Sequence, residues 1–243
     1  MNNVAIFDID NTLVRGSTLF HLGVELKKEG ILDFKKTLAM FYQQGKYRVT
    51  SYEGDSEYVK NKTLSVIKDL PAAYLEQIII KVVDKLFEKN IYEKTISLIE
   101  SHKRNLDEIW LATAGPDILA KVLAKKLNLT GGLGTEVEIK DGLCTGLLNG
   151  PLLHGNAKAL AIKELHLTRD WGSKTVYTYS DSYKDLPMLL DSDIASAVNP
   201  DKKLRKVAFS NNWQIYDNKL FRDKPLYQLI SNFVKISLAY CRK

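Results

Sequence analysis

The sequence has 243 residues, a mass of 27.5 kDa, 45% hydrophobic residues and 26% charged residues. These proportions are typical of a soluble globular protein, with room for one large domain or a core that carries an inserted module. No stretch approaches the roughly 18 consecutive apolar residues of a membrane span, and two cysteines are too few for a disulfide framework or a metal cluster. Lysine and arginine exceed aspartate and glutamate by 35 − 29 = 6, but they are spread along the chain. We therefore expect a solvated surface and no nucleic-acid partner.

The first predicted element is a short buried strand, Val4 to Phe7, which is followed by Asp8 and Asp10. Side chains at positions i and i+2 of an extended backbone project from the same side, so both carboxylates can address one point. Two close carboxylates repel each other unless a cation or a shared proton compensates. Mg²⁺ prefers such oxygen ligands. We predict a Mg²⁺ site at the carboxyl end of this strand, where open α/β sheets bind ligands.

The paired aspartates have two other interpretations. A calcium-binding loop also begins Asp-x-Asp, but Leu13 stands where that loop needs glycine and Leu19 where it needs a bidentate acid. An acidic turn that caps the next segment stays open as the alternative. The chain enters this strand without a basic and apolar signal stretch, and its cysteines are expected to be reduced. Both features favour a cytoplasmic location.

From about residue 15 to residue 90 the sequence predicts helices and almost no strand. Apolar residues recur at helical spacing among lysines and glutamates, as in Leu19, Leu22 and Leu26, in Phe34, Leu38 and Phe41, and in the stripe from Leu75 to Leu86. Pro71 suits the start of that stripe, and Tyr47 to Val49 gives the single strand signal. We predict an all-helical insertion between the first two core strands, with a helical layer of one domain as the alternative.

The α/β pattern returns after residue 90. We predict an amphipathic helix from Ile91 to Arg104 and a strand from Ile109 to Thr113, followed by Ala114, Gly115 and Pro116. Pro116 suits the first turn of the next helix. A hydroxyl at a strand end, beside the free N–H groups of a helix start, makes a phosphate cradle. Threonine is also common as a cap or as a strand residue, so this signal is weak alone.

Glycines and turn residues shape the middle of the chain. The run from Thr130 to Gly134 is followed by alternating apolar and polar residues, so it does not open a helix and is not a dinucleotide fingerprint. Asp141-Gly142 predicts a hairpin turn. Asn156 predicts an N-cap, which puts Lys158 in the first turn of a helix, where a cation opposes the helix dipole. Such a broken local rule indicates a functional site; a solvated surface lysine is the alternative.

A second strand that ends in acids follows. Thr175 to Tyr179 predicts a strand, and Ser180, Asp181 and Asp185 come directly after it. Ile194 to Val198, a basic helix to about Val207 and Trp213 to Tyr216 supply the last core elements. The final predicted helix, Pro225 to Lys243, carries an apolar stripe, and packing on the core is favoured over contact with a membrane surface.

Four of these features resemble, in order, the motifs of the haloacid dehalogenase-like (HAD) phosphohydrolases, in their phosphoserine-phosphatase-like branch (subfamily IB). They are Phe7-Asp8-Ile9-Asp10-Asn11-Thr12-Leu13, then Thr113, then Lys158, then Asp181 with Asp185. Ser180 replaces the usual glycine of the fourth motif. The resemblance implies an α/β fold: a Rossmann-like parallel-sheet core with helices on both faces, formed by residues 1–15 and 91–243. It also implies an all-helical cap, residues 16–90, inserted between the first two motifs.

The resemblance further implies a Mg²⁺-dependent phosphatase. Asp8 would attack phosphorus and form an aspartyl-phosphate, and Asp10 would act first as acid and then as base. Asp185 would hold Lys158 or a metal-bound water. The implied metal ligands are Asp8, the main-chain carbonyl of Asp10, and Asp181. The implied phosphoryl ligands are Thr113, Lys158 and the main-chain N–H groups of Asn11 and Ala114.

The substrate and the reaction type leave more choices. Phosphoserine phosphatases carry a glutamate seven positions past the second aspartate, whereas this chain has Ser17, which favours another small phosphorylated metabolite. Arg15, Ser17 and Arg48 are candidate substrate contacts, and a surface charge is the plainer interpretation of both arginines. A phosphotransferase or mutase is the alternative reaction. A non-catalytic membrane- or partner-binding protein on this fold is the second class of function, against which the complete motif set argues.

Overall fold

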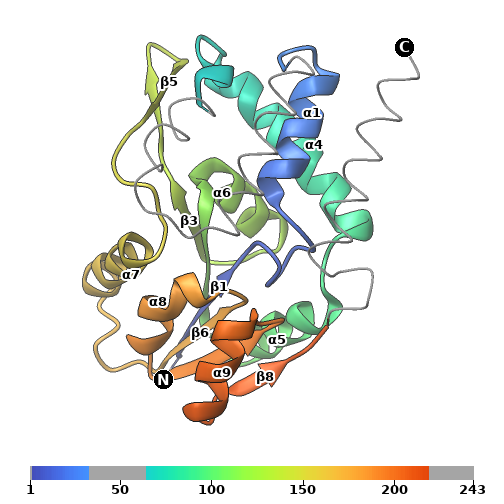
Figure 1. Cartoon of the computed structure of the whole chain (residues 1–243). Coiled ribbons are helices and arrows are strands. Elements are labelled where there is room, and N and C mark those ends of the chain that lie inside the picture. The colour runs from blue at the N-terminus through green and yellow to red at the C-terminus, as the bar shows by residue number, and fades with distance from the viewer. Residues whose placement is uncertain (1, 33–63, 219–243) are drawn as a thin grey trace.

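The computed structural model describes residues 2–32 and 64–218. At its centre lies a six-stranded sheet with the strand order β3-β2-β1-β6-β7-β8, in which every neighbouring pair is parallel (Figure 1). The strands are β1 (Val4–Asp8), β2 (Glu108–Pro116), β3 (Gly131–Thr135), β6 (Val176–Ser180), β7 (Ile194–Val198) and β8 (Gln214–Tyr216). The strands after β1 build outward on one side, and those after β6 build outward on the other. The strand order therefore reverses between the two central strands, and such a switch point is where α/β sheets bind ligands.

Helices cover both faces of the sheet, because both faces of β1 are apolar. Ala5 and Phe7 belong to one buried cluster, and Val4 and Ile6 to another. The first cluster is covered by α5 (Glu93–Arg104) and α6 (Asp117–Lys126), the second by α7 (Asn156–Thr168), α8 (Leu186–Leu190) and α9 (Lys202–Ser210). Continuous apolar strands of this kind are typical of parallel sheets. The predicted Rossmann-like α/β fold is confirmed.

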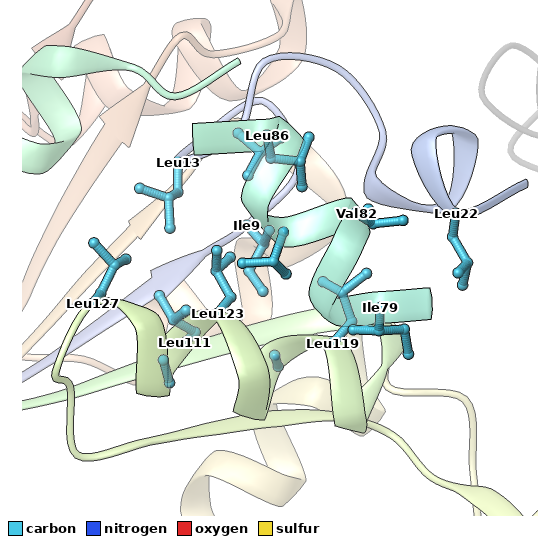
Figure 2. Packing of buried hydrophobic residues seen from close by; sticks show 14 of the residues in the cluster. Ile9, Leu13, Leu22, Ile79, Val82, Leu86, Leu111, Leu119, Leu123 and Leu127 are labelled. Atoms are coloured by element: carbon cyan, nitrogen blue, oxygen red, sulfur yellow. The ribbon is translucent and has the colours of Figure 1, made fainter. Parts of the chain in front are cut away.

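The helical insertion contributes α1 (Thr18–Lys28), the short 3-10 helix η2 (Ser65–Ile67) and α4 (Ala72–Lys89). Glu25 of α1 and Glu29, the C-cap residue directly after α1, pair with Lys85 and Lys81 of α4, at 2.6 and 2.7 Å. The other side of α4 packs on α6: Figure 2 shows Ile79, Val82 and Leu86 of α4 together with Leu119 and Leu123 of α6. The insertion therefore shares its core with the α/β unit, and the boundary at residues 16–90 stays a prediction.

Three predicted elements lie outside the described residues: the helix around Phe34, Leu38 and Phe41, the strand signal at Tyr47 to Val49, and the last helix from Pro225 to Lys243. In the part of the chain that is described, no helix combines the length and the apolar character that a bilayer crossing requires.

The predicted Asp-Gly hairpin is present as β4 (Val137–Lys140) and β5 (Leu143–Leu148). Asp141 and Gly142 both have positive φ, 52° and 78°, as a two-residue turn of the I′ type requires. The hairpin is joined to the segment before α4 by main-chain hydrogen bonds at 2.8–2.9 Å: from Asp69 to Cys144, from Cys144 to Leu70 and from Ala72 to Gly142. The hairpin and the insertion are thus linked through their backbones.

The glycine-rich run forms the edge strand β3, not a nucleotide loop. A Cβ on Gly132 would lie 2.4 Å from the carbonyl carbon of Ala120, and one on Gly134 would lie 2.5 Å from the Cα of Asp117. These glycines let the backbone of α6 approach the sheet closely. Excluding the fingerprint was correct, but the sequence did not predict this strand, because glycine carries no strand propensity.

Glu108, at the start of β2, links this strand to the segment between α7 and β6. Its carboxylate accepts hydrogen bonds from Lys174 at 2.5 Å, Arg169 at 3.1 Å and the Trp171 indole at 3.3 Å. Burial acts to raise the pKa of Glu108, but the hydrogen bonds from Lys174, Arg169 and Trp171 outweigh it and lower the pKa to about 2.

We expect Glu108→Gln to reduce the free energy of unfolding at pH 7 by about 1 kcal/mol, the scale of a partly exposed ion-pair network. A lowered carboxyl pKa stabilises the fold above the unfolded value of 4.5 and loses that contribution as pH falls toward 2. The variant and the parent should therefore converge in stability between pH 5 and pH 2 in urea unfolding. A constant difference across that range would contradict this role for Glu108.

Candidate active site

The loop after β1 has one apolar side and one acidic side. Ile9 and Leu13 are fully buried in the core. Figure 2 shows both among the apolar side chains of α4 and α6. The carbonyl of Ile9 accepts hydrogen bonds from the N–H groups of Leu13 and Val14, at 2.9 and 2.8 Å. This tight loop holds the alternate residues, Asp8 and Asp10, at the carboxyl edge of the sheet.

The ammonium group of Lys158 joins two segments at this edge. It lies 2.8 Å from Oδ1 of Asp8 and 2.8 Å from Oδ2 of Asp185, and the lysine is only 2% exposed. Asp185 ends the short 3-10 helix η3 (Tyr183–Asp185) and also accepts a hydrogen bond from the Ser180 hydroxyl at 2.8 Å. The Thr12 hydroxyl donates to Oδ2 of Asp8 at 3.1 Å. The two carboxylates and the lysine therefore form one buried network.

The network carries more negative than positive charge. Burial would lower the pKa of Lys158, but Asp185 and Asp8 raise it well above its ordinary value, so the ammonium stays charged. Burial raises the pKa of Asp8 to about 7; Lys158 opposes this effect, while Asp185 and Asp10 add to it. One lysine thus does not fully compensate the carboxylates around it, and an added cation would be stabilised here.

Asp10 is bound to the first helix of the insertion. Its Oδ1 accepts a hydrogen bond from the main-chain N–H of Thr18, the first residue of α1, at 2.9 Å. A carboxylate is stabilised at a helix N-terminus by the free N–H groups and by the helix dipole. The insertion therefore fixes the second aspartate, while β1 fixes the first.

Thr113 lies beside the acids on the neighbouring strand. Its preceding residue, Ala112, is the register partner of Asp8, and the β2–β3 pairing becomes irregular after this point. The Thr113 hydroxyl accepts a hydrogen bond from the N–H of Gly115 at 3.0 Å, which orients the oxygen and leaves its own proton free to donate. The carbonyl of the predicted phosphoryl ligand Ala114 accepts from Thr135 at 2.8 Å.

Asp181 follows β6 directly and is half-buried. Its carbonyl accepts a hydrogen bond from the N–H of Asp201 at 2.8 Å. Because β6 pairs with β1 in parallel, with Tyr179 opposite Phe7, Asp8 and Asp181 leave neighbouring strands at the same edge. The structure therefore brings Asp8, Lys158 and Asp185 into direct contact and places Asp10, Thr113 and Asp181 along the same edge.

Two local predictions need correction. The N-cap of α7 is Gly155, not Asn156, because the cap has φ 56° and ψ −123°, a conformation that favours glycine. The N–H of Asn11, predicted to bind a phosphoryl oxygen, donates instead to the carbonyl of Val14 at 2.7 Å. Asn11 has φ 61°, and its own carbonyl accepts from the Asn199 side chain at 2.8 Å. Asn11 therefore shapes the loop.

The predicted substrate contacts have mixed outcomes. The Arg15 guanidinium lies over the Tyr92 ring, 5.1 Å from its centroid. Ser17 is the N-cap of α1, with no side-chain hydrogen bond to the helix. Arg48 lies outside the described residues.

Sequence reasoning assigned no role to three residues that support the site: Thr12, Ser180 and Asn199. Thr12 belongs to the first motif and could have been found there. Ser180 is more than a small substitute for the glycine of the fourth motif, because its hydroxyl donates to Asp185. Asn199 gives only the signal of an Asn-Pro turn.

The donor set fits Mg²⁺ better than a metal held wholly by protein side chains. Across residues 2–32 and 64–218, no three acidic, histidine or cysteine side chains converge as a metal cluster. The predicted set contains two carboxylates, from Asp8 and Asp181, and one main-chain carbonyl, from Asp10. Mg²⁺ is usually held by one or two carboxylates together with water and substrate phosphate, so the two predicted carboxylates and the uncompensated charge beside Asp8 fit that ion.

Comparison with known proteins gives consistent results. The family model described as haloacid dehalogenase-like hydrolase matches residues 5–190. Phosphoserine phosphatase SerB1 of Mycobacterium tuberculosis is 36% identical over 220 residues, which cover 90% of this chain and 71% of that protein. A Bordetella pertussis protein of unknown function has a similar structure, with a TM-score of 0.79, 21% identity, and coverage of 90% of this chain and 100% of the other.

A phosphoserine phosphatase solved as a phosphoaspartyl intermediate analogue also has a similar structure. Its TM-score is 0.61 at 20% identity, over 90% of this chain and 94% of the other.

We expect Lys158→Met to reduce the free energy of unfolding by about 3–5 kcal/mol, because it leaves Asp8 and Asp185 buried side by side without a cation. Adding Asp185→Asn to this variant removes one of the two charges and should recover part of the loss. Urea unfolding of the single and double variants gives the coupling between the two positions. Strictly additive losses would contradict the shared network.

Proposed function

Since this chain belongs to the haloacid dehalogenase-like hydrolases and is a phosphatase of their phosphoserine-phosphatase-like branch, we propose that it hydrolyses small phosphomonoesters with Mg²⁺, through an aspartyl-phosphate on Asp8. The observation that carries the proposal is the position of Lys158 between Asp8 and Asp185, both within 2.8 Å. A phosphomonoester dianion is repelled by an anionic nucleophile, so positive charge must already be present at the point of attack.

In the first step, an Asp8 oxygen forms a bond to phosphorus while the bond from phosphorus to the ester oxygen breaks. Asp10, held by the N–H of Thr18, gives its proton to the leaving oxygen. The Thr113 hydroxyl donates to a phosphoryl oxygen. The phosphoserine phosphatase solved as a phosphoaspartyl intermediate analogue supports a covalent step of this kind.

In the second step, a water oxygen attacks the phosphorus of the aspartyl-phosphate, and Asp10 takes a proton from that water. The bond between phosphorus and Asp8 breaks, which restores the carboxylate and releases inorganic phosphate. Mg²⁺, when it is held by Asp8, Asp181 and the carbonyl of Asp10, neutralises charge on the phosphoryl oxygens. Lys158 stays charged throughout and keeps the Asp8 carboxylate in place.

The substrate is the finer part of the proposal. The relative named phosphoserine phosphatase supports phosphoserine as a candidate, but Ser17 offers no negative charge to a substrate amine. Ser17 is the N-cap of α1 and precedes Thr18, whose N–H binds Asp10. Because Asp10 is the proposed acid for the leaving group, we propose that Ser17 lies near the leaving group of the substrate. We propose a small phosphorylated metabolite other than phosphoserine.

We expect phosphate release from p-nitrophenyl phosphate to require Mg²⁺ and to stop on addition of EDTA. Asp8→Asn should lower kcat at least a thousandfold, because the amide cannot act as the nucleophile. A phosphate-release assay measures both effects, and circular dichroism of the variant checks its fold. Turnover that persists in the variant would overturn the proposed nucleophile, and turnover that persists in EDTA would overturn the proposed metal dependence.

We expect Ser17→Glu to raise kcat/KM for phosphoserine by about tenfold to a hundredfold, because a carboxylate there can pair with the substrate amine. Turnover of p-nitrophenyl phosphate, which has no amine, serves as the control and should not rise with it. A parent enzyme that already prefers phosphoserine over a panel of metabolite monoesters would contradict the proposed substrate class.

A further inference from the structure

Thr18 has a polar group that the fold itself does not use. The residue is fully buried, and its main-chain N–H holds Asp10. Its hydroxyl makes no hydrogen bond within the described part of the chain. Burying a hydroxyl without a partner costs free energy, so an unpaired hydroxyl next to a reacting carboxylate suggests a partner that arrives with the substrate.

The position of Gly115 shows where that partner would lie. A Cβ built on Gly115 would be 3.4 Å from the Thr113 hydroxyl and 3.7 Å from the Thr18 hydroxyl. Two hydroxyls from different elements, β2 and α1, therefore face the same space on the side of Gly115 that has no side chain. Thr113 already accepts a hydrogen bond from the Gly115 N–H, so its proton is free to point into that space.

We propose that the Thr18 hydroxyl binds the phosphoryl group of the substrate together with Thr113, and that Gly115 lacks a side chain so that a phosphoryl oxygen can reach both. The inference rests on the proposed function, because it adds a second hydroxyl to the same phosphate site. It also gives the insertion a direct role: α1 fixes Asp10 through the Thr18 main chain and binds phosphate through the Thr18 side chain.

The main test is Thr18→Val, which keeps the shape of the side chain and removes the hydroxyl. Inorganic phosphate is the probe, measured by inhibition of p-nitrophenyl phosphate turnover and by the rise in Tm that phosphate and Mg²⁺ cause in the free enzyme. We expect phosphate to bind about tenfold to a hundredfold more weakly, as for loss of a hydrogen bond to a charged group. The variant without phosphate should be at least as stable as the parent, because no hydrogen bond is lost.

Three further variants make the test specific. Thr18→Ser keeps the hydroxyl and should bring phosphate affinity back to within about threefold of the parent. Gly115→Ala, at a position without positive φ, fills the shared space and should weaken phosphate binding as Thr18→Val does. Thr178→Val is the matched control: it removes a buried hydroxyl that is paired with Ser192 at 2.7 Å, so it should lower stability and leave phosphate affinity unchanged.

Unchanged phosphate affinity in Thr18→Val, or a loss of stability equal to that of Thr178→Val, would overturn the inference and leave the phosphatase proposal standing. A parent enzyme that binds phosphate but turns over no monoester would overturn the proposed hydrolysis. In that case, weaker phosphate binding by Thr18→Val would still support the phosphate contact.

Discussion

The ammonium group of Lys158 lies between the carboxylates of Asp8 and Asp185, and because all three side chains are buried, each depends on the other two. The lysine comes from the start of α7, one aspartate from the end of β1 and the other from the turn after β6. A buried charge without its partners is strongly destabilising. The turn at Gly155 therefore has to place Lys158, and the short helix η3 has to place Asp185, within hydrogen-bonding distance of each other beside Asp8.

The second constraint is the two-sided loop from Ile9 to Leu13. Its apolar residues, Ile9 and Leu13, are part of the core that α4 and α6 share. The positions of Asp8 and Asp10 therefore depend on how the insertion packs. Asp10 is then held by α1, which is paired to α4 through Glu25 and through its C-cap residue Glu29. The insertion thus holds the loop in two ways: α4 packs on its apolar residues, and the N–H of Thr18 in α1 binds Asp10.

Much of this arrangement was predictable from the sequence, because the signals were local and chemically specific. Strands that end in aspartates, a lysine placed against a helix dipole and an Asp-Gly turn each carry a physical reason within a few residues. The strand at Gly131–Thr135 was not predictable, because its glycines are explained by the approach of Ala120 and Asp117 from another element. The use of the Asn11 N–H by Val14, and the positive φ at Gly155, are backbone geometries that residue type alone does not fix. Thr12, Ser180 and Asn199 each donate a hydrogen bond to a residue of the site, to Asp8, Asp185 and Asn11 respectively. These partners depend on which groups tertiary packing brings within reach.

The hydrogen bond from Asn199 to Asn11 joins positions 188 residues apart, and the pair of Lys158 with Asp8 spans 150 residues. At synthesis rates of about 5–20 residues per second, the first aspartate waits roughly 8–30 s for its lysine on the ribosome. Until β2 has been made, the apolar strand β1 has neither of its neighbours, and β6 is made later still. A nascent chain of this topology would therefore leave β1, whose five residues are all buried in the folded protein, without a partner for longer than any other strand of the sheet.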